Sequence, residues 1–236
     1  MKKKIAILGS TGSIGKNLIN IISKNKNIFD VILLTANKNH KDLLNQANLL
    51  NVKNLIITNH SSYLKLKNQN LNHKIKIFNN FNDFKKIFKK KIDYTMSSIS
   101  GINGLDPTFK IIEYTKVLAI ANKEAIICGW NIINKKLIKY KTKFIPVDSE
   151  HFSIWYALKN DKTSKLNKIY LTASGGPFLN LPKKKFSSIK PSNAIKHPNW
   201  KMGNKISVDS STLMNKVFEV IEAKNIFNIE YKKLSI

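Results

Sequence analysis

Two acidic residues in the second half of the chain have the spacing of a metal site. Asp148 and Glu150 are separated by one residue and follow the apolar run from 143 to 147, which is expected to form a strand. A strand that ends here would leave both carboxylates at the edge of a cleft. Ser149 lies between them, and His151 opens a segment whose apolar residues have helical spacing.

A second stretch, residues 205–223, has the spacing of a helix with one polar face. Residues that are three or four positions apart share a helix face. By this spacing, the polar side of the helix contains Asn215, Lys216, Glu219 and Glu222. The apolar side contains Leu213, Val217 and Ile221.

Oxygen ligands without a cluster of Cys and His favour Mg²⁺ or Mn²⁺ over zinc. The expected site takes carboxylates from Asp148, from Glu150 and from the later helix. The neighbouring Asn215 and Lys216 would suit a phosphorylated sugar that chelates the ion. Without a metal, the paired carboxylates could instead act as general acid and base. Glu222 could be a solvated helix residue.

The beginning of the chain has the pattern of a dinucleotide-binding turn. The apolar strand run 5–8 leads into a G-x-x-G-x-x-G motif, residues 9–15, and then into a helix with apolar residues from 18 to 22. This arrangement brings backbone N–H groups and a helix N-terminus to a pyrophosphate. Thr11 and Ser13 can add hydroxyl contacts. Glycine also occurs in ordinary turns, so the position between strand and helix carries the prediction.

The end of the second expected strand, residues 31–36, indicates which dinucleotide binds. NAD enzymes place an acidic residue here to accept a hydrogen bond from the ribose 2′-hydroxyl. This chain instead has Asn37, Lys38 and Asn39, and no carboxylate until Asp42. A cation and two amides favour the 2′-phosphate of NADP, although Lys38 could be one more solvated lysine in a lysine-rich chain.

Helices and strands alternate up to residue 147, which is typical of a doubly wound parallel sheet. Ligands of such sheets bind beyond the carboxyl ends of the strands. Asn122, Lys123 and Glu124 directly follow the apolar strand 117–121, so they could touch the nicotinamide and the substrate. The same residues could simply open the helix 125–140, with Asn122 as its N-cap.

Two loops of the second half could close over a ligand. Ser174 begins a Ser-Gly-Gly turn whose N–H groups could hold a phosphate, and Gly-Gly-Pro could equally be a plain turn. Residues 190–203 contain His197 and Trp200 among Pro, Gly and Asn. A large aromatic side chain in such a loop suggests a lid that orders over the ligand and excludes water.

The charge of +27 suggests a nucleic-acid partner, but the composition argues against one. All 41 basic residues are Lys, whereas readers of bases and phosphates favour Arg. The lysines also extend over the whole chain together with Asn and Ile. We therefore expect neither nucleic-acid nor membrane binding, since no apolar run approaches the length that spans a bilayer.

One cysteine, Cys128, excludes an internal disulfide and suits a reducing, cytoplasmic compartment. It lies in an apolar run, so a buried structural thiol is expected. The N-terminal MKKKIAILGS is interrupted by Gly and Ser before a signal sequence could form.

Six motifs together resemble one enzyme family. GSTGSIG, ANKE, PVDSEH, ASGGPF, HPNWKMG and KISVDSSTLMNK occur in the order and approximate spacing of the 1-deoxy-D-xylulose 5-phosphate reductoisomerases. The resemblance covers nearly the whole chain. It implies a Rossmann-like α/β domain over residues 1–147, which binds NADPH, and an α+β catalytic domain over residues 148–236, which binds metal and substrate.

The resemblance also implies site residues. NADPH would be held by Thr11, Gly12, Ser13, Ile14, Asn37, Lys38, Asn39, Asn122, Glu124 and Gly203. The metal ion, Mg²⁺ or Mn²⁺, would be held by Asp148, Glu150 and Glu219. The substrate would be held by Lys123, Ser149, Glu150, Ser174, His197, Trp200, Ser210, Asn215, Lys216 and Glu219. Catalysis would involve Lys123, Asp148, Glu150, His197 and Glu219.

The family's reaction is the NADPH-dependent rearrangement and reduction of a deoxyxylulose phosphate to 2-C-methyl-D-erythritol 4-phosphate, an isoprenoid precursor. Family members are considerably longer, with a C-terminal helical domain, so we expect the catalytic domain to be incomplete, the chain alone to have little activity, and a homodimer at full length. The family position of Asn37 is usually Gly.

Three alternatives remain open from the sequence: another NADP oxidoreductase resembling semialdehyde dehydrogenases, a basic nucleic-acid-binding protein, and a decayed gene product that folds without catalysing. The first would need a loop cysteine as nucleophile, and Cys128 lies in an expected helix.

Overall fold

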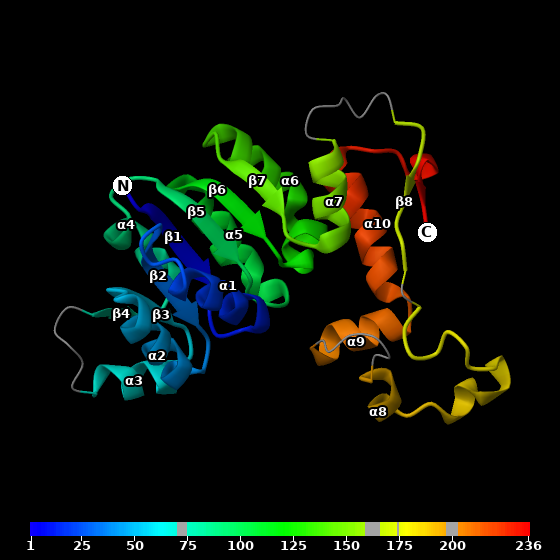
Figure 1. Cartoon of the computed structure of the whole chain (residues 1–236), viewed down its shortest axis with the longest axis horizontal. Helices are drawn as coiled ribbons and strands as arrows, with labels where there is room; N and C mark the ends of the chain where they lie inside the picture. Colours follow the sequence, from blue (N-terminus) through cyan, green and yellow to red (C-terminus); the bar gives the residue numbers. More distant parts are fainter. Residues whose placement is uncertain (70–74, 159–165, 174, 197–202) are drawn as a thin grey trace. The chain divides into compact units, whose positions relative to one another are not determined.

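The chain divides into two structural units. The computed structural model describes residues 1–69, 75–158, 166–173, 175–196 and 203–236. The units are Met1–Val147 and Asp148–Ile236 (Figure 1).

A seven-stranded parallel sheet forms the centre of the first unit, in the order β4-β3-β2-β1-β5-β6-β7. Its strands are β1 (Lys3–Leu8), β2 (Phe29–Ala36), β3 (Asn54–Ile57), β4 (Lys76–Phe78), β5 (Ile92–Ser97), β6 (Thr115–Ile120) and β7 (Lys143–Pro146). The strands at the centre of the sheet contain apolar runs, such as Ile5–Leu8 in β1, because a parallel sheet is buried on both faces. The strand order reverses between β1 and β5, and doubly wound sheets bind their ligands at this point.

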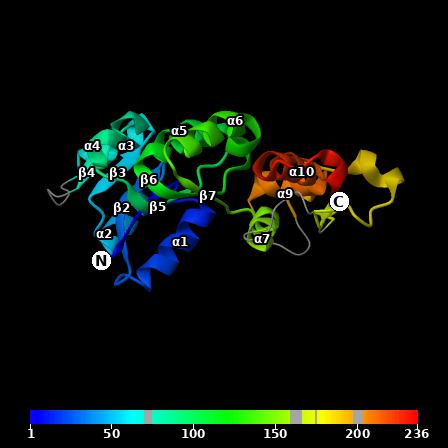
Figure 2. The ribbon, with the colours of Figure 1, turned by 90° about the horizontal axis from the view of Figure 1, so that it is seen from above.

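Helices cover both faces of this sheet, as expected for a doubly wound α/β fold. They are α1 (Ser13–Ser23), α2 (His40–Leu50), α3 (His60–Lys67), α4 (Phe84–Ile87), α5 (Leu105–Ile111) and α6 (Lys123–Lys139). Figure 2 shows α1 on one side of the sheet and α5 and α6 on the other. Short 3₁₀ turns occupy Phe81–Asp83, Ile102–Gly104 and Ile112–Tyr114. The helix expected over 81–90 is therefore a 3₁₀ turn followed by the short α4.

Asparagine side chains begin several of these helices. The Oδ1 atoms of Asn39, Asn59 and Asn122 accept hydrogen bonds from the backbone N–H groups of the first turns of α2, α3 and α6, respectively. Such caps satisfy N–H groups that have no partner within the helix.

The second unit is mostly helical. It contains α7 (Ser149–Ala157), α8 (Pro191–Ala194), α9 (Asn204–Ser211), α10 (Met214–Phe227) and 3₁₀ turns at Lys183–Ser188 and Tyr231–Lys233. Two short strands, β8 (Ile169–Tyr170) and β9 (Leu234–Ser235), pair in parallel. These elements form the expected α+β arrangement.

The prediction of one helix over residues 205–223 is wrong in two respects. The segment breaks into α9 and α10 at Leu213, which has the left-handed φ of 59°. Its expected apolar side is also exposed, with Leu213 at 51% and Val217 at 46%, whereas Lys216, Glu219 and Glu222 are buried. The polar face of α10 therefore packs inward.

Cys128 also differs from expectation. It lies on α6, as predicted, but its side chain is exposed rather than buried. The buried side chains of the apolar run around it are those of Ala125 and Ile126.

Candidate active site

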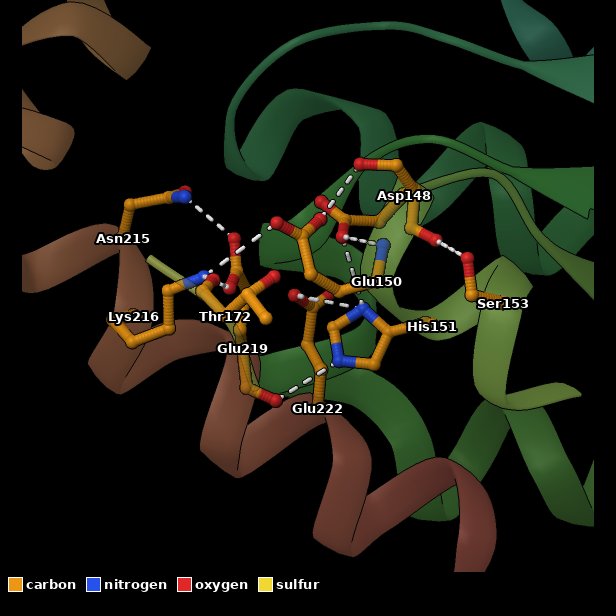
Figure 3. Close-up of polar contacts among 10 residues, drawn as sticks. Asp148, Glu150, His151, Ser153, Thr172, Asn215, Lys216, Glu219 and Glu222 are labelled. Carbon is orange, nitrogen blue, oxygen red and sulfur yellow. Dashed lines mark hydrogen bonds and ion pairs between the residues drawn. The ribbon is translucent and has the colours of Figure 1, made fainter. Parts of the chain in front are cut away.

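Three carboxylates of the second unit converge on one point. Asp148 is the N-cap of α7, where its side chain accepts a hydrogen bond from the N–H of Glu150 at 3.3 Å. Glu219 lies in the middle of α10 and is 1% exposed. One oxygen each from Asp148, Glu150 and Glu219 lie within 4.8 Å of one another (Figure 3).

Lys216 lies against two of these carboxylates. Its ammonium contacts Glu219 and lies 3.5 Å from Oε1 of Glu150. It also donates a hydrogen bond to the backbone carbonyl of Thr172. The side chain of Lys216 is only 6% exposed, so the positive charge is held inside the cluster by the negative charges around it.

The carboxylate cluster forms part of the wall of a cavity of about 620 Å³. Hydroxyl, amide and ammonium donors lie in the same wall, from Ser149, Ser210, Asn215 and Lys216. Gly175, with a φ of +87°, and Thr172 add backbone surface. Carboxylates beside convergent donors can hold a divalent ion and a phosphorylated ligand together.

Three oxygen donors this close fit a hard divalent cation in number and chemistry. Glu219 is too deeply buried to carry a negative charge without a cationic partner. The Lys216 ammonium shows that the cluster already favours positive charge at this point. The residues present therefore fit Mg²⁺ or Mn²⁺.

The first unit contains a cleft of about 620 Å³ at the carboxyl ends of its strands. The residues that line it come from five segments of the chain: Gly9, Thr11 and Gly12; Thr35 to Asn37; Thr58; Phe81; and Ser98 to Ser100 with Asn103. These segments lie at or just after the ends of β1, β2, β3, β4 and β5. This is the edge of a doubly wound sheet where dinucleotides bind.

The glycine turn allows close approach of the backbone at the mouth of this cleft. Gly9 has a φ of +84°, and a Cβ there would lie 2.9 Å from the carbonyl oxygen of Ser98. A Cβ at Gly15 would lie 2.4 Å from the carbonyl oxygen of Gly9. Both positions therefore require glycine to hold α1 against the end of β1.

The comparison with known proteins separates the candidate families. Residues 5–129 match the family model of 1-deoxy-D-xylulose 5-phosphate reductoisomerase, and residues 144–227 match the C-terminal domain model of the same enzyme. The chain belongs to the 1-deoxy-D-xylulose 5-phosphate reductoisomerase family.

Curated reductoisomerases resemble the chain over almost its entire length. The enzyme of Pelagibacter ubique is 59% identical over 99% of this chain and 61% of its own length. The enzyme of Wolbachia pipientis from Culex pipiens is 43% identical over 98% of this chain and 59% of its own length. The chain thus spans about three fifths of the curated reductoisomerases it matches.

Solved reductoisomerases have the same fold. The Zymomonas mobilis enzyme in complex with NADPH matches with a TM-score of 0.89 and 33% identity, over 99% of this chain and 60% of that one. A reductoisomerase in complex with NADPH, fosmidomycin and magnesium matches with a TM-score of 0.87 and 30% identity, over 99% and 60% of the two chains.

The residues expected to bind NADPH in this member of the reductoisomerase family do not all lie in the cleft of the first unit. Thr11, Gly12 and Asn37 line the cleft. Ser13 and Ile14 lie exposed in the first turn of α1, and Lys38 and Asn39 lie exposed between β2 and α2. Gly203 belongs to the second unit, where it caps α9.

The amides of Asn37 and Asn39 already have partners within the protein. Asn37 donates to the hydroxyl of Thr58 at 2.8 Å, and Asn39 donates to Asp42 at 2.9 Å. The Asp42 carboxylate also pairs with Lys16 at 2.7 Å, and hydrogen bonding to Lys16 lowers the pKa of Asp42. Lys38 therefore stays the clearest candidate for a 2′-phosphate, and the two amides would have to exchange partners to reach it.

Asn122 is the N-cap of α6, which was one of the two roles expected for it from the sequence. Its Oδ1 accepts from the N–H of Ala125, and its Nδ2 donates to the carbonyls of Ile99 and Gly101. The side chain is 3% exposed, so it fixes the loop 98–103, which lines the cleft. Lys123 and Glu124 form the first turn of α6.

Ser174, His197 and Trp200 lie outside the described residues. Their expected contacts with substrate, and the expected closure of a lid by Trp200, stay predictions.

Sequence reasoning missed the group that supports the carboxylates. His151 is fully buried and donates from Nε2 to the backbone carbonyl of Glu219 at 2.9 Å. Its Nδ1 lies 3.3 Å from Asp148 and 3.9 Å from Glu222 (Figure 3). Glu222 is 1% exposed, so its interpretation as a solvated helix residue is wrong. Helical spacing places Glu222 on the same helix face as Glu219, and this spacing was the signal in the sequence that could have predicted its burial beside the metal ligands.

The environment of His151 has opposing electrostatic effects. Burial alone would lower the pKa of His151, because a charged ring is costly away from water. The hydrogen bond to Asp148 and the charge of Glu222 outweigh this effect and raise the pKa above its ordinary value. The ring is therefore suited to lie between two carboxylates.

None of the helices in the described part of the chain is long and apolar enough to cross a bilayer.

Proposed function

We propose that this chain carries the cofactor, metal and substrate residues of a 1-deoxy-D-xylulose 5-phosphate reductoisomerase. The reaction is the NADPH- and metal-dependent conversion of 1-deoxy-D-xylulose 5-phosphate to 2-C-methyl-D-erythritol 4-phosphate. The observation that supports it best is the convergence of Asp148, Glu150 and Glu219, surrounded by donors suited to a phosphorylated sugar.

In this proposal the chain's residues bind and orient, while the cofactors supply the chemistry. A bound divalent ion supplies Lewis-acid polarisation of the sugar oxygens, and NADPH supplies the hydride. Asp148, Glu150 and Glu219 hold the ion, and Ser149, Ser210, Asn215 and Lys216 donate hydrogen bonds to the substrate. The glycine turn of residues 9–15 presents N–H groups to the pyrophosphate of NADPH.

The division of labour between the two units gives a direct test. Glu150→Gln keeps the shape of the side chain but removes a negative charge from the metal site. We expect loss of Mn²⁺ binding, measured by electron paramagnetic resonance, and NADPH affinity within about twofold of wild type, measured by fluorescence. The matched control is Glu230→Gln, an exposed carboxylate that pairs with Lys232.

The reaction itself is tested with the sugar phosphate as substrate. NADPH oxidation and the branched product, identified by mass spectrometry, should both depend on Mg²⁺ or Mn²⁺. Single-turnover conditions make slow conversion measurable. A protein that binds neither NADPH nor Mn²⁺ would refute the proposal, and so would an NADPH oxidation rate that Glu150→Gln leaves unchanged.

The remaining expectations concern the cell and the assembly. We propose a cytoplasmic enzyme that acts on a small phosphorylated sugar rather than on nucleic acid and is dimeric at full length. Light scattering of the full-length protein and a gel shift with DNA at low salt check these points.

A further inference from the structure

The donors expected to hold the substrate are hydrogen-bonded to the carboxylates expected to hold the metal. The hydroxyl of Ser149 donates to Oε2 of Glu150 at 2.7 Å. The amide of Asn215 donates to Oε1 of Glu219 at 2.5 Å. The ammonium of Lys216 contacts Glu219 and lies near Glu150. Each of these donors therefore has a carboxylate of the proposed metal site as its partner.

A divalent ion would compete with these donors for the same oxygens. Its positive charge would offset the negative charge that attracts Lys216, and it would lie beside the ammonium as a like charge. The competition is strong because the pair is shielded from water: the side chains of Lys216 and Glu219 are 6% and 1% exposed. Asn215 would lose its acceptor in the same way.

The released donors have a place to go. Ser149, Asn215 and Lys216 all line the cavity, together with Ser210 and Gly175. Lys216 also donates to the carbonyl of Thr172, another cavity residue, and so has a second partner on that wall. Rotation of side chains is therefore sufficient to turn these donors from the carboxylates to a ligand in the cavity.

We propose that the cluster exchanges partners: a divalent ion on Glu150 and Glu219 releases Lys216 and Asn215 to bind the anionic group of the substrate. This inference rests on the metal site of the proposed function. It makes binding of metal and of anion positively cooperative, and linkage requires each to strengthen the other equally. Lys216 thus opposes the metal in the free protein and helps the anion once the metal is bound.

The alternative is that Lys216 serves as a permanent counter-ion that keeps the carboxylates together. The two roles predict opposite signs. A permanent counter-ion is needed for metal binding, so its removal would weaken binding. A competitor lowers metal affinity, so its removal would strengthen binding.

The first experiment measures Mn²⁺ affinity of the purified protein by electron paramagnetic resonance. Lys216→Met keeps most of the side-chain volume and removes the charge. We expect Mn²⁺ to bind at least about tenfold more tightly, as removal of a like charge at close range requires. The control is Lys205→Met, which removes a 57%-exposed charge paired with Asp209 on α9 and should leave the affinity unchanged.

The second experiment begins with the wild-type protein, so its first result does not depend on any variant. Calorimetry with inorganic phosphate, with and without Mg²⁺, should show at least about fivefold tighter phosphate binding in the presence of metal. In Lys216→Met this coupling should fall to near unity, whereas phosphate bound directly to the ion would keep it. Circular dichroism checks that the variant is folded.

The outcomes separate the inference from the function on which it rests. Wild-type protein that binds no Mn²⁺ would overturn both. Wild-type protein that binds Mn²⁺ but loses affinity in Lys216→Met, or whose phosphate affinity ignores Mg²⁺, would overturn the partner exchange alone.

Discussion

His151 connects the two helices that carry the carboxylates. It belongs to α7, contacts the N-cap Asp148, and donates to the backbone of α10 at Glu219. Glu222 lies 3.9 Å from Nδ1, the same ring nitrogen that faces Asp148. Groups that support metal ligands in this way fix ligand orientation, and their loss typically lowers metal affinity.

His151→Phe should therefore weaken Mn²⁺ binding by about 10- to 100-fold, because the ring nitrogens that orient Asp148 and α10 are lost. The phenyl ring preserves the ring stacking with Phe227, whose centroid lies 6.4 Å away. The control is Phe227→Leu, which removes that stacking but no polar contact. It should lower the thermal unfolding temperature without changing metal affinity. Equal metal affinity in His151→Phe and wild type would remove His151 from this role.

Residue types, helical spacing and the family resemblance together predicted the three carboxylates that converge in this site. Asp148 and Glu150 were found because paired carboxylates after a strand have few structural uses, and Glu219 followed from helical spacing and the family resemblance. The burial of Lys216 and Glu222 could not be found in this way. Helix faces are assigned on the premise that apolar residues pack inward, and a buried ionic cluster reverses that premise in α10.

At the scale of elements, the turn between β1 and α1 is the most constrained part of the first unit. Its three glycines are not equivalent. A Cβ at Gly9 or Gly15 meets backbone atoms at 3.0 Å or less, whereas a Cβ at Gly12 has its nearest neighbour, the carbonyl oxygen of Gly9, at an ordinary 3.5 Å. Gly12 is the N-cap of α1 and lines the cleft.

Gly15→Ala should destabilise the protein by about 1–3 kcal/mol, because helix α1 must move away from the strand end. Gly12→Ala should cost less than about 1 kcal/mol, the loss expected at a helix N-cap. Denaturant unfolding without cofactor measures both, so contacts with NADPH do not contribute. Similar losses in the two variants would contradict the close packing of α1 on the turn.

The strands could be predicted from the sequence because they bury apolar residues, whereas the orientation of α10 could not, because it buries charged residues. The later parts of strands such as β1 and β6 are buried, and they are unbroken apolar runs with little ambiguity. The break between α9 and α10 gave no such signal. Leu213 adopts the left-handed conformation that glycine or asparagine usually takes, and neither glycine nor proline marks the position.

At the scale of the whole molecule, the two units differ in what fills their interiors. The sheet unit has a continuous apolar core that includes Ile7, Leu34 and Leu55, all fully buried. Among the described residues of the second unit, the buried apolar side chains are few: Leu171, Ala194, Ala223 and Ile229. Much of that interior is instead the charged cluster of Lys216, Glu219 and Glu222.

This difference predicts two separate thermal transitions in calorimetry, with the second unit unfolding first. An ion pair buried from water stabilises less than the apolar packing it replaces, so a charged interior is the weaker one. Each ligand should then protect only the unit that binds it. A ligand at 100 times its dissociation constant adds about 2.7 kcal/mol to the folded state. Mn²⁺ should raise the lower transition, and NADPH should raise the upper one.

Glu150→Gln assigns the transitions, since it should abolish the Mn²⁺ shift and leave the NADPH shift in place. Gly15→Ala should do the reverse by lowering the upper transition alone. A single transition that both ligands raise together would show that the units unfold as one. The sparse apolar interior of the second unit would then have to gain its stability from the sheet unit rather than from its own ion.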